Sequence, residues 1–183
     1  MFRDRNSGVG SICVPPEFEK MQNGVYVCMG VSGCGKTSVG KMLAGHLGVP
    51  FIEGDSFHPE ENIKKMSGGT PLTDDDRVPW LEALHSELVS NGSGGCVLAC
   101  SALKASYRKI LSDGFDNSTL RWIYLQGDFE VLKERLENRK GHFMPARLLK
   151  SQCDTLEVPE VCITISISQP LQQIFEKVKK AIL

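Results

Sequence analysis

The 183-residue sequence has no long apolar run and no strong excess of charge of either sign. No segment approaches the roughly 20 apolar residues that a membrane-spanning helix needs. The N-terminus also lacks the apolar core of a secretory signal peptide. With 21 basic and 22 acidic residues, the chain has no general attraction to nucleic acid or to an anionic membrane surface. We therefore expect a cytoplasmic protein whose partners include neither nucleic acid nor membrane.

The seven cysteines form no CxxC pair, and the chain contains no internal repeat. An odd number of cysteines without an export signal favours reduced thiols over a disulfide framework. Residues 1–23 mix charges of both signs with glycine, serine and Pro15-Pro16, and they show no hydrophobic period. We expect a flexible N-terminal extension there, followed by a single domain over residues 24–183.

Short β-prone segments alternate with segments of helical period from Gly24 onward. Strands are expected at residues 25–29, 51–52, 96–100, 121–125 and 161–167, and helices at 36–47, 59–66, 75–90, 128–138 and from 170 onward. Thr73 or Asp74 is expected to cap the third helix, and Asp128 the fourth. This alternation predicts an α/β fold, with a parallel sheet of about five strands and helices on both faces. In such a fold, ligands bind beyond the carboxyl ends of the strands.

The segment Gly30–Thr37 fits the phosphate-loop pattern GxxxxGK[ST] in full, between a buried strand and an amphipathic helix. Glycines let backbone N–H groups surround phosphates, and the helix N-terminus adds partial positive charge. We expect Lys36 to reach the β- and γ-phosphates as a catalytic group, Thr37 to ligate Mg²⁺ and Cys34 to contribute mainly its backbone. The predicted nucleotide-binding residues of the loop are Gly30, Val31, Ser32, Gly33, Cys34, Gly35, Lys36 and Thr37.

A phosphate loop alone does not identify the acceptor, because GTPases and motor ATPases share it. The chain is too short for most motor cores and lacks an NKxD guanine-reading segment, which favours a small-molecule kinase. Asp55 follows the second strand, where it can accept the proton of an attacking hydroxyl or help to order Mg²⁺. The alternative is an aspartate that serves only a turn or a helix cap.

The polar segment after Asp55 suits a hydroxylated, anionic substrate. Arg77 can hold a carboxylate in a bidentate manner, and His58 and Lys65 can bond hydroxyls or the carboxylate. The run Asp74–Asp76 also complements the dipole of the following helix, and this is the preferred reading for Asp75. Ser101 ends the third strand, where it can touch substrate or phosphate.

Three residues after the third strand are expected to share one helix face. Lys104, Tyr107 and Arg108 are spaced by three and four residues, and Arg108 is the candidate for a second anion contact. Cys96 and Cys100 are expected to be buried thiols that act as small hydrophobic side chains.

Several short runs outside the phosphate loop form a more specific pattern across nearly the whole chain from Gly24 on. They are Gly54-Asp55, HPxxNxxKM from His58, Gly69, Pro71-Leu72, Asp74, Asp76-Arg77, Pro79-Trp80-Leu81, CSALKxxYR from Cys100, Arg135-Leu136, Arg139, Gly141-His142-Phe143, Leu148-Leu149, Ser151-Gln152 and Thr155-Leu156-Glu157. By these runs the chain resembles the gluconate kinases of the short phosphate-loop, shikimate-kinase-like type. The resemblance implies Mg²⁺-dependent transfer of a phosphoryl group from ATP to the terminal hydroxyl of D-gluconate. The product, 6-phospho-D-gluconate, feeds the pentose phosphate pathway, and relatives of this type are commonly homodimers.

The resemblance also implies roles for residues of a small lid over about residues 135–147. As in nucleoside monophosphate kinases, Arg135 is assigned to the adenine side and Arg139, as a catalytic group, to the transferring phosphoryl group. His142 lies at the lid tip and is assigned to the substrate. The alternative for the two arginines is a solvated helix face paired with Glu134 and Glu137.

The chain departs from the family pattern in a few places. Serine is usual at the position of Cys34 and an aromatic residue at that of Cys153, and the stretch from Glu157 to Val161 is short. Shikimate kinases and nucleoside monophosphate kinases share the expected architecture, but segment 58–66 argues against both. A nucleotide-binding regulatory module without turnover is a further alternative, which the intact Lys36, Thr37, Asp55 and Arg139 disfavour.

Overall fold

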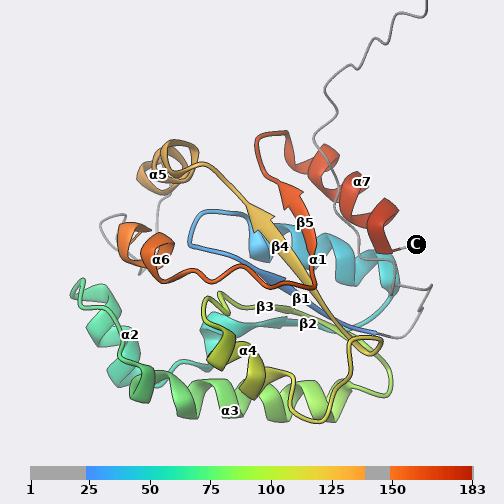
Figure 1. The fold of residues 1–183 in the computed structure, drawn as a ribbon, viewed down its shortest axis with the longest axis horizontal. Helices are drawn as coiled ribbons and strands as arrows, with labels where there is room; N and C mark the ends of the chain where they lie inside the picture. The colour runs from blue at the N-terminus through green and yellow to red at the C-terminus, as the bar shows by residue number, and fades with distance from the viewer. Residues whose placement is uncertain (1–23, 139–148, 183) are drawn as a thin grey trace, which may run out of the picture.

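The computed structural model describes residues 24–138 and 149–182, which form a five-stranded sheet between two layers of helices (Figure 1). The strands are β1 (Val25–Met29), β2 (Phe51–Glu53), β3 (Cys96–Ala99), β4 (Leu120–Gln126) and β5 (Ile163–Ser166). Their order is β2-β3-β1-β4-β5, and all four pairings are parallel. The predicted α/β fold is confirmed. The expected N-terminal extension lies outside the described residues.

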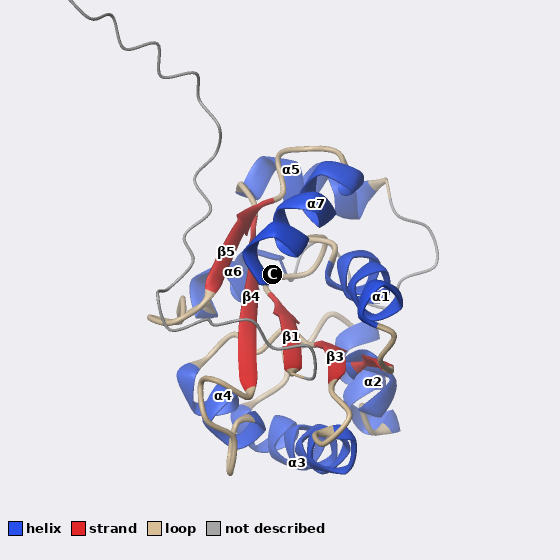
Figure 2. Cartoon of the chain, turned by 90° about the vertical axis from the view of Figure 1, so that its right-hand side faces the viewer, coloured by secondary structure: helices blue, strands red, loops and turns tan. Residues whose placement is uncertain are grey.

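The helices cover both faces of the sheet, as expected. They are α1 (Lys36–Leu47), the short 3₁₀ helix η1 (Gly54–Phe57), α2 (Glu60–Ser67), α3 (Asp74–Asn91), α4 (Ala105–Leu111), α5 (Phe129–Glu137), α6 (Leu149–Thr155) and α7 (Leu171–Ile182). Helices α1 and α7 lie on one face, and α3 and α4 lie on the other (Figure 2). None of the helices in the described parts of the chain combines the length and apolar character needed to cross a membrane.

The buried strands divide their side chains between two hydrophobic cores. On β1, Tyr26 and Cys28 face the core that contains α1 and α7 residues, whereas Val25, Val27 and Met29 face the core built on α3 and α4. All five residues are buried, which explains why the strand is a continuous apolar run rather than an alternating one. The sheet is therefore a rigid central layer whose carboxyl edge can hold loops in fixed positions.

All of the predicted strands and helices are present, most of them with shifted ends. The last strand is shorter than expected and β5 covers only Ile163–Ser166, while α3 begins at Asp74. Thr73 caps α3, because its Oγ1 accepts from the Asp76 N–H at 3.2 Å and its own N–H donates to Asp76 Oδ2 at 2.9 Å. Asp128 precedes α5, but among the described residues its side chain makes no capping hydrogen bond. Two short elements, η1 and α6, were not predicted.

Two glycines of α1 provide a direct test of packing between this helix and β2. A Cβ atom at Gly40 would lie 2.7 Å from Cε2 of Phe51, whereas a Cβ at Gly45 meets nothing within 4 Å. We expect Gly45→Ala to stabilise the protein by up to about 1 kcal/mol through helix propensity. Gly40→Ala should lack this gain because the Phe51 ring must move. The urea concentrations at the unfolding midpoints of the two variants test this expectation. Equal midpoints would contradict the close contact between Gly40 and Phe51.

Candidate active site

The loops that follow β1 and β3 meet at the carboxyl edge of the sheet. The N–H of Gly30 donates to the carbonyl of Ser101 at 3.3 Å, and that of Cys100 donates to the carbonyl of Cys28 at 3.1 Å. The first residue of the phosphate loop therefore lies beside Ser101, two residues after the end of β3. The predicted contact of Ser101 with substrate or phosphate stays a prediction.

The phosphate loop has the backbone conformation that its glycines allow. Gly30, Gly33 and Gly35 have φ angles of +135°, +84° and +97°, in the region that side chains disfavour. A Cβ atom at Gly30 would also approach the carbonyl oxygen of Leu125 to 2.9 Å. The loop leads directly into the N-terminus of α1, and the Nζ of Lys36 donates back to the carbonyl of Val31 at 3.1 Å. Both the curvature and the helix dipole thus favour an anion at this site.

Several predicted site residues line one open cavity, which we name the phosphate-loop cavity. Its volume is about 290 Å³, close to the lower end of the size range of ligand sites. Its lining residues come from the phosphate loop, α1, η1 and α5, and they are Ser32, Gly33, Gly35, Lys36, Thr37, Ser38, Asp55 and Arg135. The structure therefore brings together the predicted phosphate, metal, base and adenine-side residues. Cys34 is buried beneath the loop, and burial raises the pKa of its thiol.

The oxygen ligands in the phosphate-loop cavity fit Mg²⁺ better than a transition metal. Thr37 contributes a hydroxyl and Asp55 a carboxylate, the hard donors that Mg²⁺ prefers. Mg²⁺ in phosphoryl-transfer sites commonly takes only one or two protein ligands. Within the described part of the chain, no cluster of three or more His, Cys, Asp and Glu side chains is arranged to hold a metal.

Arg135 connects the phosphate-loop cavity with a second cavity at the ends of β4 and β5. Its Nη2 donates to the carbonyl of Ile167 at 2.9 Å. Ile167 helps to line a cavity of about 170 Å³ together with Gln126, Gly127, Asp128, Val131, Ser166 and Ser168. The sequence did not predict that the β5–α7 loop lies at the site, because this loop contains no motif of known chemistry. Arg139 and His142, the other predicted lid residues, lie outside the described residues.

On the acceptor side, Trp80 contacts a residue on each side of Asp55. Its Nε1 donates to the carbonyl of Gly54 at 2.8 Å, and its ring stacks on His58 with centroids 4.1 Å apart. Gly54 also has no room for a side chain, since a Cβ would lie 2.5 Å from the carbonyl of Ala99. Trp80 was not predicted as a site residue, and the signal available for it was the run Pro79-Trp80-Leu81.

His58 is held in its neutral form. Burial lowers the pKa of its imidazole to about 4, with Arg77 lowering it further and Asp55 acting in the opposite direction. Its Nδ1 is buried and has no hydrogen-bond partner among the residues that the structure describes. At neutral pH the uncharged ring can therefore form a hydrogen bond with a ligand through Nδ1 without bringing a positive charge into the site.

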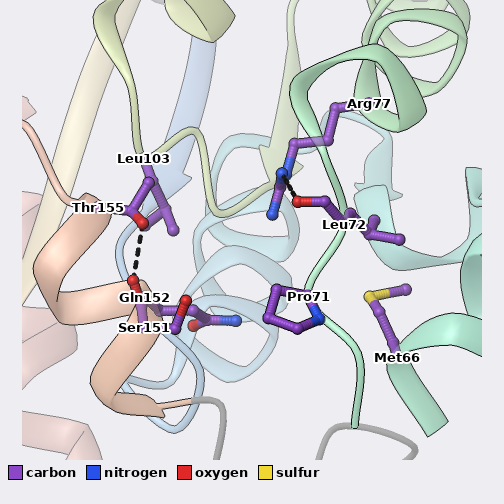
Figure 3. Close-up of a pocket in the computed structure, with 8 residues that line it drawn as sticks. All are labelled: Met66, Pro71, Leu72, Arg77, Leu103, Ser151, Gln152 and Thr155. Atoms are coloured by element: carbon purple, nitrogen blue, oxygen red, sulfur yellow. Dashed lines mark hydrogen bonds between the residues drawn. The ribbon is translucent and has the colours of Figure 1, made fainter. Parts of the chain in front are cut away.

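Two further predicted substrate residues lie at the start of α3. Lys65 donates to Asp76 Oδ1 at 2.6 Å, and this contact is the main reason that the pKa of Asp76 falls to about 2. Arg77 donates through Nη1 to the carbonyls of Leu72 and Thr73. These bonds orient the guanidinium, which lines a third cavity (Figure 3).

This third cavity, the α6 cavity, lies between α6 and the loops that precede α3 and α4. Its volume is about 30 Å³, which is room for about two water molecules, and it is lined by Met66, Pro71, Leu72, Arg77, Leu103, Ser151, Gln152 and Thr155. Its wall combines apolar side chains with a few polar groups, as small-molecule sites commonly do. Helix α6 was not predicted, although its Ser151-Gln152 pair belongs to the family pattern.

Arg108 bonds to the protein itself in this structure. Its Nη1 donates to the carbonyls of Ala102, Leu103 and Glu157 at 3.0, 3.2 and 2.8 Å. Ala102 has a φ of +44°, an uncommon conformation for a residue with a side chain. The buried guanidinium thus stabilises the turn between β3 and α4. Its predicted contact with a substrate anion stays a prediction, and these bonds favour the supporting role.

Asp74 joins the start of α3 to α4. Lys104 Nζ donates to both carboxylate oxygens at 2.8 Å, and the Tyr107 hydroxyl donates to the same group. The Lys104 hydrogen bond is the main cause that lowers the pKa of Asp74. Lys104 precedes α4 as its N-cap residue, so the prediction that it lies within the helix is wrong. Asp74 and Asp76 therefore each form an ion pair with a lysine, in addition to interacting with the dipole of α3.

The comparisons with known proteins agree with this geometry. The shikimate kinase family model matches residues 32–180. A thermoresistant gluconokinase of Escherichia coli is 44% identical over 81% of this chain and 87% of its own length. A gluconokinase of Gluconobacter oxydans is 52% identical over 73% of this chain and 75% of its own length.

Solved structures extend the likeness to three dimensions. The crystal structure of a gluconokinase from Sinorhizobium meliloti is 46% identical, with a TM-score of 0.80, and the match covers 89% of this chain and 93% of that one. An APS kinase of Mycobacterium tuberculosis, 16% identical with a TM-score of 0.61, shares the fold. The family model and the identities over most of each chain establish that this chain belongs to the shikimate kinase family and, within it, to the gluconokinases.

Proposed function

We propose that this chain transfers the terminal phosphoryl group of ATP to the terminal hydroxyl of D-gluconate, forming 6-phospho-D-gluconate. The observation that carries the proposal is the convergence of Lys36, Thr37 and Asp55 on one cavity, in a chain whose relatives are named gluconokinases. By the same resemblance we propose a homodimer that acts in the cytoplasm.

The phosphate loop holds the nucleotide in this proposal. Backbone N–H groups and the N-terminus of α1 receive the phosphates, and Lys36 exchanges its contact with the Val31 carbonyl for the β- and γ-phosphates. Arg135 lies on the adenine side, next to the cavity at the ends of β4 and β5. Thr37 and Asp55 would hold Mg²⁺, which neutralises phosphate charge when it is bound.

Asp55 is the acceptor-side base. As the gluconate hydroxyl oxygen bonds to the γ-phosphorus, Asp55 accepts the hydroxyl proton, and the bond from that phosphorus to the bridging oxygen breaks to release ADP. Neutral His58 and Ser101 bond substrate hydroxyls. Arg77 and Lys65 receive the carboxylate, and Lys65 does so by leaving its exposed ion pair with Asp76.

The remaining assignments rest on the resemblance to the family. Arg139 stabilises the negative charge on the transferring phosphoryl group, and His142 contacts the substrate from the lid over residues 135–147. Both residues fall in segment 139–148, outside the described residues. Closure over the two substrates would exclude the water that otherwise hydrolyses ATP.

A coupled ATPase assay with gluconate, shikimate and nucleoside monophosphates tests the acceptor. We expect turnover with gluconate, and turnover with shikimate alone would refute the proposal. Nucleotide binding without turnover of any acceptor would instead favour a regulatory module.

Asp55→Asn tests the base. We expect this variant to bind an ATP analogue as the wild type does and to lose about 10²- to 10⁴-fold in kcat, the usual contribution of a general base. Asp75→Asn is the matched control, because Asp75 is an exposed residue in the first turn of α3. A near-normal kcat for Asp55→Asn shows that another group takes the proton.

Trp80→Phe tests whether the Gly54 hydrogen bond positions Asp55. Phenylalanine keeps an aromatic ring against His58 but removes the N–H that donates to the buried carbonyl. We expect kcat to fall about tenfold, the equivalent of one lost hydrogen bond, with the KM for ATP unchanged. Trp122→Phe is the control, since Trp122 is buried in the same core but lies on β4. Equal kcat values for the two variants would contradict the role of Trp80.

The low pKa of His58 predicts a dependence of stability on pH. Because the folded-state pKa of about 4 lies below the usual 6.5, the neutral ring contributes stability fully above pH 6.5. This contribution is lost as the pH falls from 6.5 towards 4. We expect the unfolding free energy of the wild type, measured in urea, to fall across this range more steeply than that of His58→Asn. Parallel pH profiles would show that His58 is not held neutral.

A further inference from the structure

Gln152 of α6 reaches the phosphate loop from far along the chain. Its side-chain oxygen, Oε1, accepts a hydrogen bond of 2.7 Å from the backbone N–H of Ser32, 120 residues away in sequence. Ser32 lines the phosphate-loop cavity, and Gln152 lines the α6 cavity. One side chain therefore lines the α6 cavity and bonds to a residue that lines the phosphate-loop cavity.

The hydrogen bond from Ser32 to Gln152 helps to hold the first half of the phosphate loop in its conformation. Glycine on both sides of the segment Val31-Ser32 gives the backbone wide freedom, with positive φ at Gly30 and Gly33. The Lys36 bond to Val31 also holds this half, together with the backbone bonds of Gly30 to Ser101 and of Cys34 to Val31. The nucleotide phosphates compete for the Lys36 ammonium group. The bond from Ser32 to Gln152 does not depend on Lys36, so it can persist when the nucleotide is bound.

The far end of α6 is tied to the acceptor side. The N–H of Glu157 donates to the carbonyl of Leu103 at 2.8 Å, and its Oε2 accepts from the N–H of Ala105 at 2.6 Å. Its carbonyl accepts from the buried Arg108. Helix α6 and the residues after it thus bridge the phosphate loop and the β3–α4 turn, with the α6 cavity between them (Figure 3).

We propose that Gln152 is a positioning residue that fixes the phosphate loop and couples it to a ligand bound beside Arg77, at the edge of the α6 cavity. A hydroxylated carboxylate bound beside Arg77 restricts the Gln152 side chain, and this restriction stabilises the loop conformation that receives the nucleotide. The coupling to the acceptor rests on the proposed function. The positioning of the loop does not, because it follows from the Ser32 hydrogen bond alone.

Gln152→Met tests the positioning, because methionine has a similar length but no carboxamide oxygen. Without any acceptor, we expect the Kd of a non-hydrolysable ATP analogue to rise about fivefold, the equivalent of one hydrogen bond. Gln152→Ala should change in the same direction. Lys150→Met is the control on the same helix, where the exposed ion pair with Asp154 is lost instead. Thermal unfolding midpoints of all variants separate this effect from general destabilisation.

The same titrations with D-gluconate present test the coupling. We expect gluconate to tighten analogue binding to the wild type, and this tightening to fall below about twofold in Gln152→Met. Acceptor-free Kd values equal to that of the wild type in both Gln152 variants would overturn the positioning, whatever the acceptor proves to be. Equal tightening in wild type and Gln152→Met would overturn the coupling. If the wild type does not phosphorylate gluconate, the proposed function fails, while the acceptor-free comparison still decides the role of Gln152.

Discussion

The parallel register of β1, β2 and β3 sets the positions of the phosphate loop, Asp55 and Ser101 at the candidate site. Ala99 pairs with Cys28 of β1 on one side and with Glu53 of β2 on the other, so three strands end at nearly the same level. The phosphate loop, η1 and the Ser101 turn begin there. Because backbone hydrogen bonds hold the strands in this register, small changes in the loops cannot move the chain segments that carry Lys36 and Asp55 apart.

Many residues of the family pattern stabilise the acceptor side without facing a ligand cavity. Asn62 is buried and donates to the Asp76 carbonyl at 2.7 Å, which ties α2 to α3. Asp74 joins α3 to Lys104 and Tyr107, and Arg108 supports the turn after β3. A buried polar group without a partner lowers the stability of the fold by about 1–3 kcal/mol. The donor and the acceptor of each such bond must therefore both be present in the sequence. The specificity of the pattern thus reflects the scaffold around the acceptor as much as contacts with it.

Local patterns were enough to predict most elements and the phosphate loop, but they missed η1 and α6. Both elements are short, and η1 follows β2 directly as a turn of 3₁₀ helix. Helix α6 has one buried residue, Leu149, so no hydrophobic period marks it. Trp80 is visible in the sequence only as part of a motif. A role at the site was not predicted for it, because a buried aromatic residue usually serves packing alone. Arg108 was assigned to an anion because its charge is visible in the sequence, whereas its carbonyl partners are not.

The sequence by itself determined the parallel α/β class, the phosphate loop and the resemblance to gluconate kinases. These features depend on neighbouring residues, because strand and helix periods and positive φ at glycine are local properties. Only the tertiary structure decided that Thr37, Asp55 and Arg135 share a cavity, that Trp80 holds Gly54 and His58, and that Gln152 bonds Ser32. The residues brought together in this way lie between 18 and 120 positions apart, and chain folding rather than sequence spacing brings them together.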